Sequence, residues 1–95
     1  MSVTFNPAVF VTAEIGELLQ ELEQQERALS RRRGQMHDRL DFVRGGGGGE
    51  GPVAAERITV LEGQEKALSE QRRELQSQID ALQTESERRR RTAEL

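Results

Sequence analysis

The feature that most constrains the fold of this chain is a seven-residue hydrophobic repeat that occurs in two separate segments. The first segment carries it at Ile15, Leu22, Leu29, Met36 and Val43, and the second at Leu61, Leu68, Leu75 and Leu82. Such a repeat is typical of helices that pack as a coiled coil. Both segments are rich in Glu, Gln, Arg, Leu and Ala and lack an internal proline, so each favours one long helix.

A glycine-rich break separates the two segments. Five consecutive glycines, Gly45 to Gly49, precede Glu50, Gly51 and Pro52, a composition typical of a flexible linker. We therefore predict an all-α fold: an antiparallel helical hairpin or coiled coil of two long helices. The expected single domain covers 1–95, with an N-terminal segment at 1–11, helices at 12–44 and 53–94, and the linker at 45–52. Asn6 and Pro7 could also cap an earlier helix start.

The composition argues against several classes of protein. Only 34% of the residues are hydrophobic and three are aromatic, too few for an enzyme with its own buried cleft, so no catalytic residue is expected. Without Cys, and with one His, the chain offers no disulfide and no multi-ligand metal site. Its apolar stretches are too short for a membrane span or a signal peptide. The net charge of −3 argues against direct DNA binding, and we expect a cytoplasmic protein.

The companion positions of the repeat carry charge in the middle of each helix. They are Leu19, Glu26, Arg33 and Leu40 in the first segment, and Ile58, Glu65, Arg72 and Ile79 in the second. A shift of 39 residues superposes the two series. The chain is therefore an internal repeat of one helix, and both copies replace apolar seam residues by Glu and Arg.

A five-residue polar pattern follows the same register. The second copy has Glu65, Ser69, Arg72, Gln76 and Asp80, and the first has Glu26, Ser30, Arg33, His37 and Asp41. At about 100° per residue each set lies on one helix stripe roughly 80° wide. A stripe of this chemistry suits a large, flat, polar ligand. A guanine base fits, because arginine presents a planar fork to its O6 and N7 acceptors and a carboxylate accepts from its donors.

Two interpretations compete at this point. Charged residues at helical spacing usually form a solvated face, and buried Glu and Arg pairs can specify the register of a coiled coil. A register device needs only one or two such residues, whereas five positions recur here in phase. The repetition therefore favours the ligand-binding interpretation, in which two helices present the same groups to one ligand that itself has two-fold symmetry.

The complete second copy resembles the motif E-x3-S-x2-R-x3-Q-x3-D of the small anti-sigma factors of the RsiG type; the first copy departs from it only at His37. The two copies cover about a third of the chain. The resemblance implies an antiparallel coiled coil that binds cyclic di-GMP as an intercalated pair, and that sequesters a WhiG-like sigma factor and so represses transcription. Within it, Arg72 would contact or stack on guanine and Asp80 would accept from the base. Ser69 and Gln76 would reach phosphate and ribose, and Glu65 would orient Arg72 or accept from the base.

Two positions of the first copy weaken the match. His37 is shorter than Gln, and histidine is the residue type whose charge is most readily switched by pH. This copy is therefore expected to be weaker or sensitive to pH, or else His37 is a plain solvated residue. Gly34 stands where the second copy has Arg73. It marks either tolerance or a close approach of a ligand or partner.

The register of the hairpin bears on the site. If the helices end near Arg44 and begin near Val53, the residue numbers of facing positions sum to about 97. Residues 26–41 of the first motif then lie opposite 56–71, whereas the second motif is 65–80. The two motifs are therefore offset by about nine residues, roughly 13 Å along the helices. A longer loop, to about residue 61, would remove the offset. So would an antiparallel homodimer through the second helix, in which two complete motifs meet by symmetry. We favour the homodimer, with the first motif a relic or a helper.

The ends of the chain allow two interpretations each. The apolar N-terminal residues could pack on the helix ends or belong to a partner surface; they are Val3, Phe5, Val9, Phe10 and Val11. Arg88 to Arg91 form either a solvated tail, favoured by the helix dipole, or a contact with phosphate or an acidic partner. For the whole chain, the alternatives to the sensor are a ligand-free coiled-coil scaffold or dimerisation module, and a nucleotide-binding helical protein whose target is not a sigma factor.

Overall fold

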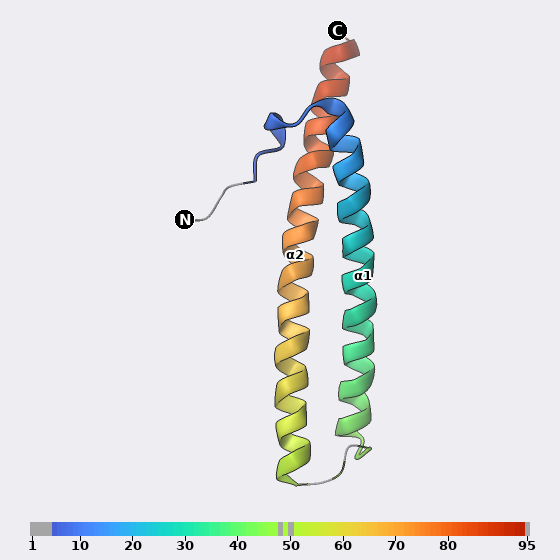
Figure 1. Ribbon diagram of the computed structural model, residues 1–95, viewed down its shortest axis with the longest axis vertical. Coiled ribbons are helices and arrows are strands. Elements are labelled where there is room, and N and C mark those ends of the chain that lie inside the picture. Colours follow the sequence, from blue (N-terminus) through green and yellow to red (C-terminus); the bar gives the residue numbers. More distant parts are fainter. Residues whose placement is uncertain (1–4, 48, 50, 95) are drawn as a thin grey trace. The chain divides into compact units, whose positions relative to one another are not determined.

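The computed structural model describes residues 5–47, 49 and 51–94, and its architecture is a helical hairpin. Helix α1 spans Thr12–Arg44 and helix α2 spans Pro52–Glu94, and the two pack against each other in antiparallel directions (Figure 1). A short 3-10 helix, η1, spans Pro7–Val9. The part of the chain that the structure describes contains no strand. The all-α fold predicted from the heptad repeat is confirmed.

The N-terminal caps explain why α1 begins at Thr12 and not at Pro7. Asn6 does act as a cap, but of η1: its Oδ1 accepts from the backbone N–H of Ala8 at 3.1 Å. The chain is extended again at Phe10. Glu14 Oε1 then accepts from the N–H of Val11 at 3.3 Å, which is the reach-back half of a capping box. This bond stabilises the first turn of α1, which begins at Thr12, shortly after η1 ends at Val9.

The glycine run ends α1 through backbone geometry that glycine adopts without strain. The N–H of Gly46 donates to the carbonyl of Val43 and that of Gly47 to the carbonyl of Phe42, at 3.1 and 2.9 Å, the two bonds of a Schellman motif. Gly46 has φ of 93°, in the left-handed region that disfavours a side chain. Gly51 has φ of 80° and accepts from Ala55 at 3.2 Å, so α2 starts with Pro52 in the first helical position.

The chain divides into two compact units. Unit 1 combines residues 1–26 with 74–95, and its helices enclose the apolar core. Four buried residues form that core, namely Ile15, Leu22, Ile79 and Leu82. Phe5 and Phe10 pack against it, with their ring centroids 6.1 Å apart. Of the apolar N-terminal residues, these two pack on the hairpin as one interpretation expected, whereas Val9 and Val11 are 73% and 59% exposed and Val3 lies outside the described residues.

Unit 2 comprises residues 27–73. Its buried apolar residues are Leu40 and Ala54. The seam positions Leu29, Met36, Leu61 and Leu68 are half-buried, and the middle of the seam is filled by charged side chains. Among the described residues, no helix is long and apolar enough to cross a bilayer.

Candidate ligand-binding site

The centre of the candidate site is a cluster of three charged or titratable side chains in unit 2. Glu65 on α2 accepts from His37 Nε2 on α1 at 2.7 Å, and Arg33 Nε lies 4.0 Å from the same carboxylate oxygen, Oε1. The Glu65 side chain is 20% exposed, that of Arg33 38% and that of His37 49%. The structure thus brings two residues of the first motif to the first residue of the second motif.

These contacts also report the register of unit 2. The expected register placed residue 65 opposite residue 32; the observed contacts lie one to five residues further along α1, at Arg33 and His37. A third pair, Arg44 with Glu62 at 3.4 Å, is displaced in the same direction but further, since the expected register placed residue 62 opposite residue 35. Since α2 begins at Pro52, Ile58 and Leu61 stay helical, and the alternative of a longer loop is not realised.

The other motif residues of unit 2 differ in burial. Ser30 and Ser69 are half-buried, whereas Asp41 and Arg72 are exposed. The reason is periodicity: the pattern takes 15 residues over four turns, whereas the heptad seam repeats every 3.5 residues. Each polar stripe therefore begins within the seam and drifts out of it toward its C-terminal end.

Three motif residues belong to unit 1. Glu26 is half-buried, and Gln76 and Asp80 are exposed. Gln76 Nε2 donates to Asp80 Oδ1 at 3.0 Å, so the last two residues of the complete motif orient each other along the surface of α2.

In the unit 2 cluster, the group best suited to bind a ligand is the side chain of Arg33. Its Nε is buried and has no hydrogen-bond partner among the described groups, and the 4.0 Å separation from Glu65 exceeds hydrogen-bond length. A buried donor without an acceptor destabilises the fold by about 1–3 kcal/mol. An oxygen acceptor near Arg33 would remove that cost. Phosphate and guanine oxygens are acceptors of the right kind.

A second polar network, in unit 1, was not singled out from the sequence. Glu85 is only 8% exposed and accepts from Arg88 Nη2 at 2.6 Å and from Arg89 Nε at 2.9 Å. The hydrogen bonds from Arg88, and then from Arg89, lower the pKa of Glu85 to about 2. The signal was present as a Glu followed by arginines three and four residues later, the spacing of neighbours on one helix face.

Arg89 also holds the N-terminal segment. Its Nη2 donates to the carbonyl of Phe10 at 2.6 Å and its Nη1 to Thr12 Oγ1 at 3.2 Å. Part of the Arg88 to Arg91 run is therefore structural and not a solvated tail. The network places the turn between η1 and α1 against α2.

Neither network resembles a metal centre: the described residues include no group of three or more His, Asp or Glu side chains placed to hold a metal ion. No family model, curated protein or solved structure matches this chain. The repeated motif and the local geometry of its residues are therefore the basis for a functional proposal.

Proposed function

We propose that this chain is a cyclic di-GMP-responsive anti-sigma factor. It binds the dinucleotide through its two polar motifs and sequesters a WhiG-like sigma factor, which represses transcription. The proposed role is non-enzymatic, cytoplasmic and without direct DNA contact. The observation that supports it most is the pattern of five polar residues that recurs with the same spacing in both helices. Two of its members, Arg33 and Glu65, lie 4.0 Å apart in the seam of unit 2. The buried Nε–H of Arg33 has no acceptor among the described residues.

The proposed roles follow from the chemistry of each group. Arg72 contacts a guanine edge or stacks on the base, and Asp80 accepts from the base donors. Ser69 and Gln76 bind phosphate and ribose oxygens. Glu65 orients an arginine or accepts from the base. In the first motif, Arg33 takes the role of Arg72, and His37 takes that of Gln76 through a ring nitrogen.

We further propose that the loaded form is a homodimer through α2. The complete motif lies on α2, and its residues Arg72, Gln76 and Asp80 are exposed, so a second chain can approach them without unpacking the core of unit 1. Two antiparallel α2 motifs would then enclose an intercalated, two-fold pair of nucleotides. Four guanines would supply the aromatic surface that a chain with three Phe and no Trp or Tyr lacks.

Titration calorimetry with cyclic di-GMP tests the ligand directly. We expect binding at micromolar protein and a loss of at least tenfold in affinity for Arg72→Ala, which removes a charged hydrogen-bond donor of the complete motif. Arg33→Ala removes the corresponding donor of the first motif and should cause a smaller loss. The matched controls are Arg73→Ala and Arg32→Ala, exposed neighbours outside the motifs, which should bind like the parent chain. No heat, or equal losses in motif and control variants, would refute the sensor.

Light scattering with and without the dinucleotide tests the homodimer. We expect two chains per bound nucleotide pair. A single chain that holds a pair of nucleotides, with no change in mass, would replace the α2 homodimer by a site within one chain while leaving the ligand intact.

The sigma factor needs its own experiment. A purified WhiG-like sigma factor should co-elute with this chain in size-exclusion chromatography when cyclic di-GMP is present. With Arg72→Ala, adding cyclic di-GMP should no longer increase the amount of complex. Ligand binding without any sigma-factor complex would point to a nucleotide sensor with another target.

A ligand-free scaffold is the alternative function, and one contact favours it. The 2.7 Å contact between His37 and Glu65 gives both residues a structural role in fixing the register of the two helices. Under this alternative, His37→Gln leaves the chain inert to nucleotide. Under the sensor proposal, the same substitution completes the first motif and raises the affinity for cyclic di-GMP.

A further inference from the structure

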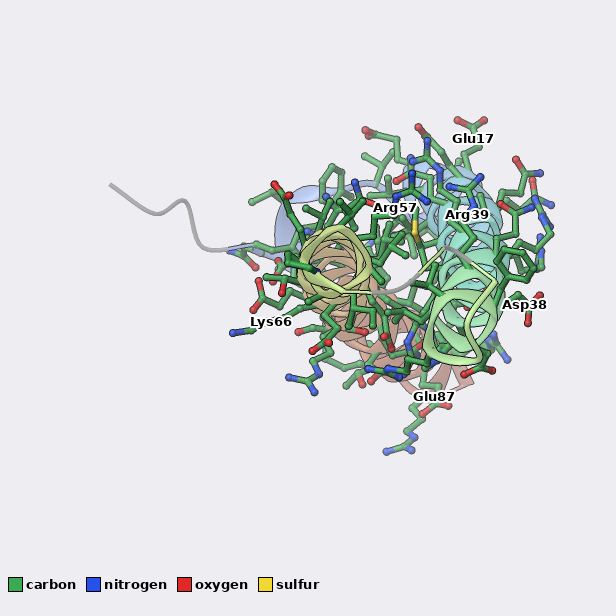
Figure 2. The ribbon with its side chains drawn as sticks, turned by 90° about the horizontal axis from the view of Figure 1, so that it is seen from below. Glu17, Asp38, Arg39, Arg57, Lys66 and Glu87 are labelled. Carbon is green, nitrogen blue, oxygen red and sulfur yellow. The ribbon has the colours of Figure 1, made fainter. Side chains whose placement is uncertain are left out.

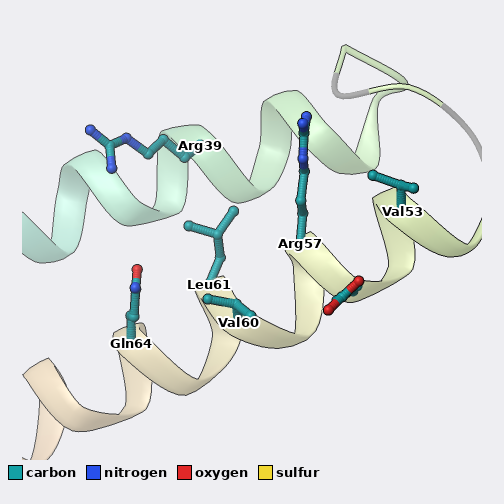
Figure 3. A pocket seen from close by; sticks show the side chains of 7 residues that line it. Arg39, Val53, Arg57, Val60, Leu61 and Gln64 are labelled. Carbon is teal, nitrogen blue, oxygen red and sulfur yellow. The ribbon is translucent and has the colours of Figure 1, made fainter.

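Unit 2 carries an open groove that the motifs do not use. It has a volume of about 530 Å³ and is lined by Arg39, Val53, Glu56, Arg57, Val60, Leu61 and Gln64. Val53 and Val60 are 58% and 53% exposed and stand seven residues apart, two turns along one face of α2. In Figure 3, Arg57 rises from α2 toward α1. Arg39 and Arg57, from the two helices, extend on the same side of the pair (Figure 2).

The groove belongs to the basic part of a chain that is acidic overall. Residues 27–73 contain ten Lys and Arg against seven Asp and Glu, a formal charge of +3. Residues 1–26 and 74–95 contain ten Asp and Glu against four Arg, a formal charge of −6. The opposite signs predict that unit 2 of one molecule attracts unit 1 of another.

Unit 1 also offers apolar side chains that could fill the groove. Val9 and Val11 are exposed just before α1, and the carboxylates of Glu14 and Glu17 follow in its first two turns. Residues 12–26 include five Glu and no Lys or Arg. The N-terminal region therefore has two exposed valines next to carboxylates, and the groove has two exposed valines next to arginines. The two surfaces are complementary in charge and both are partly apolar.

We infer that the groove lined by Arg39, Arg57, Val53 and Val60 binds the acidic N-terminal region, Val9 to Glu21, of a second copy of this chain. Each copy has both surfaces, so the proposed pairing is reciprocal: the groove of each copy holds the N-terminal region of the other, and two such contacts make a two-fold dimer. A contact made in one direction alone would instead join copies head to tail. None of the four groove residues named here belongs to a motif. This dimer therefore requires no nucleotide and differs from the proposed α2 dimer, so either can fail without the other.

Charge reversal with exchange of partners is the direct test. We would prepare R39E/R57E, in which both surfaces of a molecule are acidic, and E17R/E21R, in which both are basic. Analytical ultracentrifugation without nucleotide, at low salt, should show a dimer for the parent chain and at least tenfold weaker association for each variant. An equimolar mixture of the two variants should recover a heterodimer, because acidic then meets basic at both contacts.

Two controls separate this result from a general effect of charge. R31E/K66E makes the same change in net charge, on one exposed residue of each helix outside the groove, and should dimerise like the parent. Salt should weaken the parent dimer, since the screening length falls from about 30 Å at 0.01 M to about 10 Å at 0.1 M. Circular dichroism confirms that each variant is helical.

A cross-linking arm covers the case in which a reversal variant does not fold. The chain has no native cysteine, so Val60→Cys and Val11→Cys molecules can be mixed and oxidised. Heterodimers of the two should dominate over homodimers of either. A monomeric parent chain at 100 μM and low salt, equal losses in groove and control variants, or a mixture that stays monomeric would each overturn the inference.

Discussion

The two units of this hairpin share one heptad frame but fill it differently. In unit 1 the seam buries four apolar residues, Ile15, Leu22, Ile79 and Leu82, and its charged position, Glu26, lies at the edge of the unit. In unit 2 the equivalent positions include Arg33 and Glu65, and Leu40 and Ala54 are its buried apolar residues. The difference indicates that the apolar core is concentrated in unit 1, whereas charged side chains occupy part of the seam in unit 2. The same frame holds both parts in antiparallel pairing.

The largest expected effect separates the two seams. Leu82→Ala removes a fully buried side chain and should lower the free energy of unfolding by about 2–5 kcal/mol, since it leaves a cavity in the core of unit 1. Leu68→Ala, two heptads earlier on α2, removes a half-buried side chain and should cost less than half as much. Urea unfolding followed by circular dichroism measures both. Equal losses would mean that unit 2 is packed as tightly as unit 1.

Acid should weaken unit 1 through Glu85. Its pKa of about 2 lies below the ordinary 4.5 because Arg88 and Arg89 donate to the carboxylate. The stabilisation from ionised Glu85 is therefore complete above about pH 4.5 and is lost as the pH falls toward 2. In thermal melts, the melting temperature of the parent chain should fall as the pH is lowered from 4.5 to 2. The fall should be smaller in Glu85→Gln, which has no carboxylate at this position to protonate.

The matched control for Glu85 is two residues away. Glu87 is exposed, and its contact with Arg91 is 3.8 Å long, so Glu87→Gln should keep the acid dependence of the parent chain. An acid profile that is unchanged by Glu85→Gln would show that the Glu85 network does not contribute to stability. A profile altered equally by both substitutions would show a general effect of surface charge.

The smallest expected effect is a gain in unit 2. Gly34 and Gly63 lie inside helices, and a Cβ added to either would meet no atom within 4 Å. Gly34→Ala and Gly63→Ala should each raise the free energy of unfolding by roughly 0.5–1 kcal/mol, because alanine loses less backbone entropy on folding. Gly16→Ala makes the same change in unit 1, where the site is equally open. Thermal melts measure all three.

Gly34→Ala also addresses the first motif. If the stabilised variant binds cyclic di-GMP as the parent chain does, Gly34 is a tolerated position. Loss of binding with the helix intact would show instead that a ligand or partner backbone approaches Gly34 closely, where no side chain fits.

Much of the fold followed from spacing alone. The seven-residue repeat predicted two long helices, and five glycines predicted the break between them. Asn6 was suited to cap a helix, and it caps η1. The structure starts α1 at Thr12, as in the expected bounds of 12–44, and shows the contact that sets this start, from the Val11 N–H to Glu14. For the site, spacing put each set of five residues on one stripe. It did not show that Glu65 contacts Arg33 and His37, since the register of the hairpin is set by packing and by the turn.

The sequence by itself determined the helices, the break, the charged middle of the seam and the repeated motif, because all of these depend on the order of residues along one helix. Tertiary structure alone decided which charges meet across the helices, how Glu85 and Arg89 hold the N-terminal turn, and which valines stay exposed beside Arg39 and Arg57. Those outcomes depend on the relative shift and rotation of neighbouring helices. These follow from the sum of many side-chain contacts, and periodicity within one helix does not specify them.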